Sequence, residues 1–210
     1  MRNLARRNLA LVFLALSFAS TAFGGTILFL GDSLTAGLGV QKEQAYPALI
    51  QEKIHERNLS FEVINAGLSG DTSAGGLARL DWVLRNKVDI LVLALGANDG
   101  LRGLPIAAMK ANLQAIIDKV KATSPQVKIV IAGMQMPPNL GGEYAATFRA
   151  AFIDLAQTNN AALIPFLLEG VGGHPELNQS DQIHPSPAGH KVVAENVWRV
   201  LEPLLTKTGS

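Results

Sequence analysis

The chain contains no cysteine among its 210 residues. This absence excludes disulfides, a thiolate nucleophile and cysteine-based metal sites, and it is neutral about compartment. Charged residues are also scarce, at 17% of the chain, and the formal net charge of +1 predicts no polyanionic partner such as a nucleic acid. Aromatic residues make up only 6% and include two tryptophans and two tyrosines, so little surface is available for stacking on sugars.

The N-terminus has the layout of a secretory signal peptide. Arg2, Arg6 and Arg7 precede an apolar run over residues 9–18, and small residues follow. The run is too short for a typical membrane span. We therefore predict a signal peptide over residues 1–24, with cleavage near Ala22 or Gly24, and a mature protein that is periplasmic or secreted. An uncleaved anchor helix is the alternative.

Apolar segments of two kinds alternate along the rest of the chain. Short runs typical of strands lie at 26–30, 61–64, 89–95, 127–132 and 161–164. Segments with apolar residues at helical spacing lie at 46–57, 72–87, 105–122, 144–157 and 188–204. This alternation predicts an α/β fold of three layers (α/β/α), with a flavodoxin-like, doubly wound parallel sheet of about five strands. No linker or repeat interrupts the pattern, so we predict one domain over residues 25–210.

A serine stands where the first predicted strand ends. Gly31-Asp32-Ser33 follows the apolar run 26–30, so we expect Ser33 at the carboxyl end of the sheet, where open α/β sheets bind their ligands. The Ser33 hydroxyl is therefore a candidate nucleophile. The alternative is that Ser33 is an N-cap after a strand–helix turn, a common role for serine.

A serine nucleophile needs a general base, and neutral imidazole is the usual one near physiological pH. His184, in the segment Asp181-Gln182-Ile183-His184-Pro185, is the candidate base. Asp181 could accept a hydrogen bond from the other ring nitrogen and fix the tautomer of His184. Asp181 and His184 could instead be an ordinary helix-start pair or two metal ligands. Because no further histidine or glutamate cluster accompanies them, we predict no metal site.

Two more strand ends carry groups able to stabilise the oxyanion that forms when a carbonyl is attacked. Gly67 follows the strand at 61–64, and Asn98 follows the strand at 89–95. Because the carboxyl ends of neighbouring parallel strands meet at one crevice, we expect the N–H groups of Ser33 and Gly67 and the side-chain amide of Asn98 to converge there. In the simpler interpretation, Gly67 and Asn98 are only turn residues.

Four short segments together carry a family resemblance. They are Gly31-Asp32-Ser33-Leu34, Gly67 in its Asn-Ala-Gly context, Gly96-Ala97-Asn98-Asp99 and Asp181-Gln182-Ile183-His184-Pro185. In this order they resemble the blocks of the SGNH hydrolases, the GDSL esterase/lipase family, across the whole mature chain. Residues 96–103 and 134–141 are similar to loops of its exported bacterial branch, which contains arylesterases and the multifunctional thioesterase/lysophospholipase. Each motif alone is weak, but four in order at predicted strand ends are specific.

The resemblance implies a serine esterase that hydrolyses carboxylic esters and thioesters (aryl esters, acyl thioesters and lysophospholipids) by a Ser-His-Asp acyl-enzyme mechanism, with no cofactor. It gives the catalytic roles to Ser33, Asp181 and His184. The acyl chain is expected along apolar residues at the rim of the crevice, namely Leu101, Leu104, Met136 and Pro137. We expect no nucleic-acid partner, no stable membrane span after removal of the signal peptide, and a monomer.

Two other functions compete with this hypothesis. A carbohydrate acetylesterase of the same superfamily would need an open groove lined with aromatic residues, which this composition scarcely supplies. A non-catalytic ligand-binding module on the same fold would not need Ser33, Asp181 and His184 together. The complete set of candidate catalytic residues therefore favours an ester hydrolase.

Overall fold

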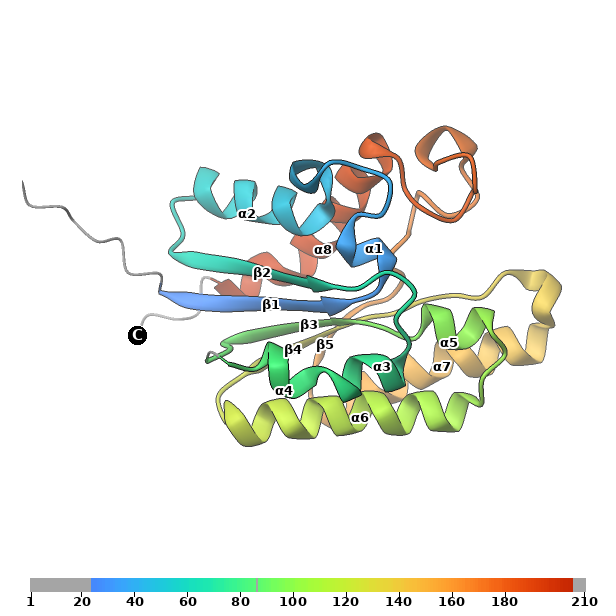
Figure 1. Cartoon of the computed structure of the whole chain (residues 1–210), viewed down its shortest axis with the longest axis horizontal. Coiled ribbons are helices and arrows are strands. Elements are labelled where there is room, and N and C mark those ends of the chain that lie inside the picture. The colour runs from blue at the N-terminus through green and yellow to red at the C-terminus, as the bar shows by residue number, and fades with distance from the viewer. Residues whose placement is uncertain (1–23, 86, 206–210) are drawn as a thin grey trace, which may run out of the picture.

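The computed structural model describes residues 24–85 and 87–205, so the predicted signal peptide, apart from Gly24, lies outside the described residues (Figure 1). Five parallel strands form one sheet in the order β2-β1-β3-β4-β5. The strands are β1 (Gly25–Gly31), β2 (Phe61–Gly67), β3 (Ile90–Ala94), β4 (Lys128–Ala132) and β5 (Ala162–Ile164). This order is the flavodoxin-like, doubly wound arrangement that the sequence predicts.

Helices cover both faces of the sheet (Figure 1). One face carries α2 (Tyr46–Glu56) and α8 (Pro187–Leu205), which pack against each other. The other carries α3 (Ser73–Ala78), α4 (Leu80–Val83), α6 (Ile106–Thr123) and α7 (Gly142–Asn159). The remaining short segments are α1 (Ser33–Ala36), α5 (Ala97–Leu101), η1 (Lys42–Gln44), η2 (Pro138–Leu140) and η3 (Pro175–Leu177). The predicted three-layer α/β/α architecture is therefore confirmed.

The core lies on both faces of the central strands. Every residue of β3 is buried, as expected for a parallel strand covered on both sides. α6 turns one apolar stripe to the sheet, made of Met109, Leu113, Ile116, Ile117 and Val120. Full burial of such a side chain stabilises the fold by roughly 1.5–3 kcal/mol relative to its exposure to water. This packing fixes the strands, and with them the loops at their carboxyl ends.

The stretch at 72–87, predicted as one helix, forms two short helices that meet at Arg79. Arg79 has φ −95° and ψ 1°, which ends α3 before α4 begins. Gly75 and Gly76 lower the helical propensity of this stretch. The Arg79 side chain also donates to Asp71 Oδ2 and to the Gly31 carbonyl, 48 residues away in the sequence. The break therefore reflects long-range contacts at the carboxyl edge of the sheet.

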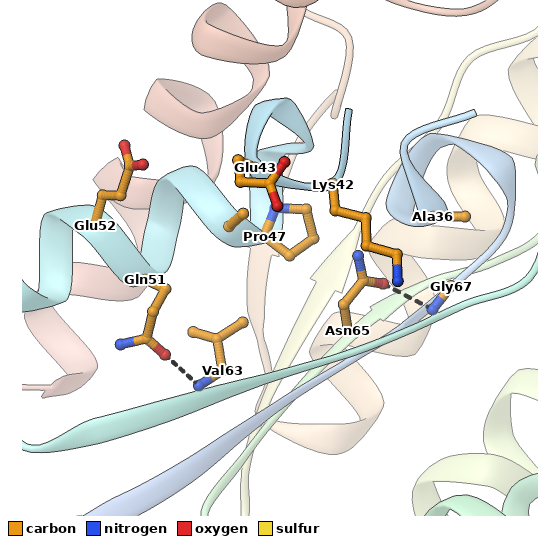
Figure 2. Close-up of a pocket in the computed structure, with 10 residues that line it drawn as sticks. Ala36, Lys42, Glu43, Pro47, Gln51, Glu52, Val63, Asn65 and Gly67 are labelled. Atoms are coloured by element: carbon orange, nitrogen blue, oxygen red, sulfur yellow. Dashed lines mark hydrogen bonds between the residues drawn. The ribbon is translucent and has the colours of Figure 1, made fainter. Parts of the chain in front are cut away.

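β2 is an edge strand, and side chains satisfy several of its outer hydrogen-bonding groups (Figure 2). The side-chain amide of Gln51, on α2, hydrogen-bonds one N–H and one carbonyl of β2, which are the groups that a neighbouring strand would bond. Its Oε1 accepts from the Val63 N–H at 2.7 Å, and its Nε2 donates to the Phe61 carbonyl at 3.1 Å. Asn65 Oδ1 accepts from the Gly67 N–H at 2.9 Å. Groups satisfied in this way are not available for pairing with another chain.

Candidate active site

Ser33 begins α1 directly after β1. Asp32 is the N-cap of this helix, because its carboxylate accepts from the Leu34 N–H at 3.0 Å. Ser33 is therefore the first helical residue, and the alternative of Ser33 as the N-cap is wrong. Ser33 is 9% exposed and lies at the carboxyl end of β1, so its hydroxyl faces the loops that follow the neighbouring strands.

The loop before α8 brings His184 to Ser33. His184 Nε2 lies 2.8 Å from Ser33 Oγ, and His184 Nδ1 lies 2.7 Å from Asp181 Oδ2. With Nδ1–H donating to the carboxylate, Nε2 remains an acceptor for the Ser33 hydroxyl. A candidate nucleophile, a candidate base and a carboxylate able to orient that base are thus in contact at hydrogen-bond distances.

Asp181 is held in its ionised form by hydrogen bonds. Its Oδ1 accepts from the N–H groups of His184 and Ile183, at 3.0 and 2.9 Å. The His184 N–H bond, then the bond with the His184 ring and the Ile183 N–H bond, lower the pKa of Asp181 to about 2. Asp181 is therefore a carboxylate throughout the neutral range and can stabilise an imidazolium at His184.

Gln179 anchors the histidine loop to the segment that follows α1. Its Nε2 donates to the Leu38 carbonyl at 2.7 Å and to the Pro185 carbonyl at 3.0 Å. Its N–H also donates to the His184 carbonyl at 2.7 Å. The sequence analysis missed Gln179, and no motif marks it, because its partners are main-chain carbonyls, one of them 141 residues away.

Asn98 reaches the same edge of the sheet from α5. This helix follows β3 through Gly96, whose φ of 113° favours glycine. Asn98 Nδ2 donates to the Asp71 carbonyl at 2.9 Å and lies 3.5 Å from Asp32 Oδ2. The amide is thus held between the residue that precedes Ser33 and the turn that follows β2.

Gly67 has a different environment from the expected one. Its N–H already donates to Asn65 Oδ1 at 2.9 Å. A Cβ atom at this position would collide with the main-chain nitrogen of Ala36. Glycine is therefore required here for the close approach of β2 to α1, and the occupied N–H argues against Gly67 as an oxyanion donor.

Asp32 and Asp71, which contact the Asn98 amide, each stand next to a residue whose backbone N–H has no acceptor within the part of the chain that the structure describes; these residues are Ser33 and Gly70. Gly70 lies in a turn that the Asp71 N–H closes with the Leu68 carbonyl at 3.1 Å. Gly70 has φ 80°, and the next residue, Asp71, accepts the Asn98 amide. Gly70 is thus a better candidate donor than Gly67, and the sequence analysis missed it.

The four predicted acyl-contact residues divide into exposed and buried positions. Leu101 and Leu104 are 47% and 39% exposed, at the end of α5 and just beyond it, and Pro137 is also exposed. Met136, in contrast, is only 7% exposed and packs close to Gly100 beneath α5. The expectation that Met136 lies at an open rim is therefore not met.

Two buried titratable side chains flank the triad. Asp32 is 2% exposed, and burial raises its pKa to about 6, although the Leu34 N–H favours the ionised form. His190 is 1% exposed, and its Nδ1 accepts from the Tyr46 N–H at 3.3 Å. Burial lowers the pKa of His190 to about 4, so it is neutral at pH 7.

A hollow of about 540 Å³ opens beside α1, between α2 and the edge strand β2 (Figure 2). Ala36, Asn65 and Gly67 line its end nearest α1, and the Lys42 side chain points toward Asn65 and Gly67. Ser33, Asp181, His184 and Asn98 do not line it. Among the residues that the structure describes, no group of three or more His, Asp or Glu side chains is placed to hold a metal ion.

A serine, an imidazole and a carboxylate in hydrogen-bond contact, at the carboxyl edge of a doubly wound sheet, define a hydrolase of the serine type. The GDSL-like Lipase/Acylhydrolase family matches residues 29–192 of the chain. The protein belongs to this family, as the four motifs predict, and it is a carboxylic ester hydrolase.

Similar proteins extend the match over nearly the whole chain. An arylesterase of Vibrio mimicus is 39% identical over 196 residues, which are 93% of this chain and 97% of that protein. Thioesterase 1/protease 1/lysophospholipase L1 of Escherichia coli K12 is 36% identical over 204 residues, or 97% and 96% of the two chains. The crystal structure of TesA is 42% identical, covers 86% of this chain and 99% of its own, and has a TM-score of 0.82. The predicted family, fold and esterase function are thereby confirmed.

Proposed function

We propose that the protein cleaves carboxylic esters and thioesters through an acyl-enzyme on Ser33. The contact of Ser33 with His184 at 2.8 Å, continued to Asp181 at 2.7 Å, carries the proposal. His184 takes the hydroxyl proton as Oγ bonds to the substrate carbonyl carbon, and Asp181 stabilises the imidazolium. His184 then protonates the leaving alcohol or thiol. Water, deprotonated by His184, attacks the acyl carbon, the bond from that carbon to Ser33 Oγ breaks, and His184 returns the proton to Oγ as the acid leaves.

The oxyanion of each tetrahedral intermediate is assigned to three donors: the N–H groups of Ser33 and Gly70, and Asn98 Nδ2. The first two are free of protein acceptors in the described chain, which supports this choice. Asn98 Nδ2 carries two hydrogens. The Asp71 carbonyl accepts one at 2.9 Å, and the other has only a long contact, 3.5 Å, with Asp32 Oδ2. The other hydrogen is then available to the oxyanion, where a preorganised donor stabilises the transition state more than the substrate.

A serine-directed fluorophosphonate, followed by peptide mass mapping, tests this mechanism. Ser33 Oγ bonds to phosphorus and fluoride leaves, so we expect one adduct on Ser33. Ser33→Ala should abolish labelling, and His184→Ala should slow it. Turnover of para-nitrophenyl butyrate should fall by at least about 10³-fold in both variants, with folding intact by circular dichroism. Normal turnover in either folded variant would show that the mechanism is wrong.

The proposed substrates are aryl esters, acyl thioesters and lysophospholipids. The names of two relatives, an arylesterase and a thioesterase/lysophospholipase, support this range. Leu101 and Leu104 lie exposed just beyond Asn98 and offer apolar surface to an acyl chain. A panel of para-nitrophenyl esters and acyl thioesters of increasing chain length tests the range. If the acyl chain contacts these residues, Leu104→Ser should raise KM more for the longer chains.

We also propose that residues 1–24 are removed on export and that the mature chain acts as a monomer in the periplasm or outside the cell. The basic, apolar and small-residue order of the N-terminus supports export. Over residues 24–85 and 87–205, no helix is long and apolar enough to span a membrane. N-terminal sequencing of the protein from a periplasmic fraction, with light scattering of the purified chain, tests both points.

A further inference from the structure

Arg79, at the break between α3 and α4, reaches back to the carboxyl edge of the sheet. Its Nε donates to Asp71 Oδ2 at 2.7 Å. Its second terminal nitrogen, Nη2, donates to the Gly31 carbonyl at 3.1 Å and to the Ala66 carbonyl at 2.8 Å. Gly31 ends β1, and Ala66 is the penultimate residue of β2. One planar guanidinium therefore joins the ends of two strands to the turn that contains Asp71.

Two of the segments that Arg79 connects carry a proposed oxyanion donor each, and the third donor, Asn98, is hydrogen-bonded to one of these segments. Ser33 lies two residues after Gly31, and Gly70 directly precedes Asp71. Asn98 is joined to the same turn, because its Nδ2 donates to the Asp71 carbonyl at 2.9 Å. Each donor is thus either close in sequence to a contact of Arg79 or hydrogen-bonded to a residue that Arg79 contacts.

The Arg79–Asp71 pair is also shielded from solvent. The two side chains are 20% and 7% exposed. Water therefore screens this ion pair less than it screens a surface pair, whose contribution to stability is usually small. The Arg79 charge balances the Asp71 carboxylate, which would otherwise oppose an anion forming next to Asn98. The fork of the guanidinium matches three fixed acceptors, whereas a lysine ammonium is a single point on a flexible stem.

We propose that Arg79 is a positioning residue of the oxyanion hole. It contacts no substrate, and it sets the spacing of the Ser33, Gly70 and Asn98 donors through Gly31, Ala66 and Asp71. This inference rests on the proposed function, because it requires an oxyanion bound by those donors. A donor displaced by a fraction of an ångström still binds the neutral ester but stabilises the transition state less.

Arg79→Lys tests the proposal, with Arg57→Lys as the matched control. Arg57 pairs with Glu202 at 3.0 Å on the surface and is 62% exposed. In Arg79→Lys we expect kcat for para-nitrophenyl butyrate to fall by roughly 10- to 100-fold, with KM within about threefold of wild type. Arg57→Lys should match wild type. Rates are expressed per active site, by fluorophosphonate titration, so that a merely structural loss of folded enzyme does not lower kcat.

A boronic acid supplies the second measurement. As the Ser33 proton passes to His184, Oγ bonds to the trigonal boron, and the tetrahedral anion that results resembles the intermediate. The inhibition constant of n-butylboronic acid should therefore rise in Arg79→Lys by about the factor that kcat/KM falls. An unchanged inhibition constant, or an unchanged kcat, would overturn the role of Arg79.

A double-mutant cycle with Asn98→Ala locates the effect. If Arg79 acts through the oxyanion donors, its substitution should change log kcat less in the Asn98→Ala background than in the wild type. Full additivity would overturn the inference. An unchanged kcat in Asn98→Ala alone would instead overturn the proposed oxyanion hole. A large loss in Asn98→Ala with no loss in Arg79→Lys would reject Arg79 and leave the proposed function standing.

Asp71→Asn gives the same test if Arg79→Lys does not fold. The amide has nearly the size of the carboxylate but lacks the charge that strengthens the bond to Arg79 Nε. We expect a fall in kcat of roughly tenfold at nearly constant KM. A folded Asp71→Asn enzyme with wild-type kcat would overturn the proposal.

Discussion

Asp32, which precedes the proposed nucleophile Ser33, stabilises α1 as its N-cap but is costly to bury as a charged group. Its carboxylate caps α1 through the Leu34 N–H, but the residue is 2% exposed, and burial raises its pKa to about 6. The folded protein therefore binds a proton at Asp32 at pH values where the unfolded chain, with an ordinary aspartate pKa of about 4, has lost it. Between about pH 4 and 6, this difference makes stability fall as pH rises.

Asp32→Asn should remove this pH dependence. An asparagine still accepts the Leu34 N–H, since Asn and Asp are equally good N-caps, and it carries no charge. The free energy of unfolding of the variant minus that of the wild type should therefore increase from pH 4 to pH 7, by up to about 3 kcal/mol for a shift of roughly two pKa units. Urea unfolding of both proteins at each pH measures it, and a constant difference would contradict the expectation.

Substitution of Asn98 should distinguish an effect on kcat from an effect on KM. Asn98→Ala removes one proposed oxyanion donor and leaves the triad contacts between Ser33, His184 and Asp181 in place. We expect kcat to fall about 10²- to 10³-fold while KM changes little, because the donor acts chiefly on the tetrahedral intermediate. Steady-state kinetics with para-nitrophenyl butyrate measures both constants. A pure rise in KM would exclude the oxyanion role.

At the scale of elements, the histidine loop depends on one glutamine. Gln179 joins the loop to Leu38, just after α1, and to Pro185 beside His184. Gln179→Ala removes both bonds, so His184 should lie within reach of Ser33 Oγ for a smaller fraction of the time. We expect kcat to fall about tenfold and the free energy of unfolding to fall by about 1–2 kcal/mol.

The matched control for the loop is Gln157→Ala. Gln157 is an exposed residue of α7, on a helix that contributes none of the proposed catalytic residues. This variant should keep wild-type kcat and stability. Equal kcat in Gln179→Ala and Gln157→Ala, measured per active site, would show that the loop holds His184 without Gln179.

Site residues at strand ends were predictable because the sequence shows both the apolar strand and the polar residue that follows it. An apolar run that stops at Gly31-Asp32-Ser33 indicates a strand and the residue exposed at its end, and Asn98 follows the same logic after β3. Asp181 and His184 are three residues apart, so a single turn suffices to bring them together. Parallel pairing then brings Ser33 and Asn98 to one edge without further information.

Other features depend on contacts that no local pattern records. Gly67 ends β2 and Gly70 lies in the turn after it, and only the fold shows that Asn65 satisfies the N–H of Gly67. The helix break at Arg79 depends on distant carbonyl groups, and the burial of Met136 depends on its packing near Gly100. Tertiary contacts decide these positions, whereas propensity and spacing decide the elements.

At the scale of the whole molecule, the sheet order determines how the protein meets other copies of itself. β2 and β5 are the two edges, and β5 has only three residues. A strand that short offers few groups for pairing. β2 is longer, with seven residues, and Gln51 occupies its outer groups at Phe61 and Val63. The proposed monomer therefore depends in part on this one side chain.

Gln51→Val should weaken this protection. It removes the bonds to the Val63 N–H and the Phe61 carbonyl, so we expect the free energy of unfolding to fall by about 1–2 kcal/mol. The freed edge should also promote association at high protein concentration, measured by light scattering coupled to size exclusion.

Gln157→Val, an exposed substitution on α7 with the same helix-propensity cost, is the control and should stay monomeric. In dilute solution, Gln51→Val should keep near wild-type kcat, because Gln51 lies on α2 and makes none of the triad contacts. A Gln51→Val protein that matches the control in stability and size at every concentration would show that the β2 edge does not need Gln51.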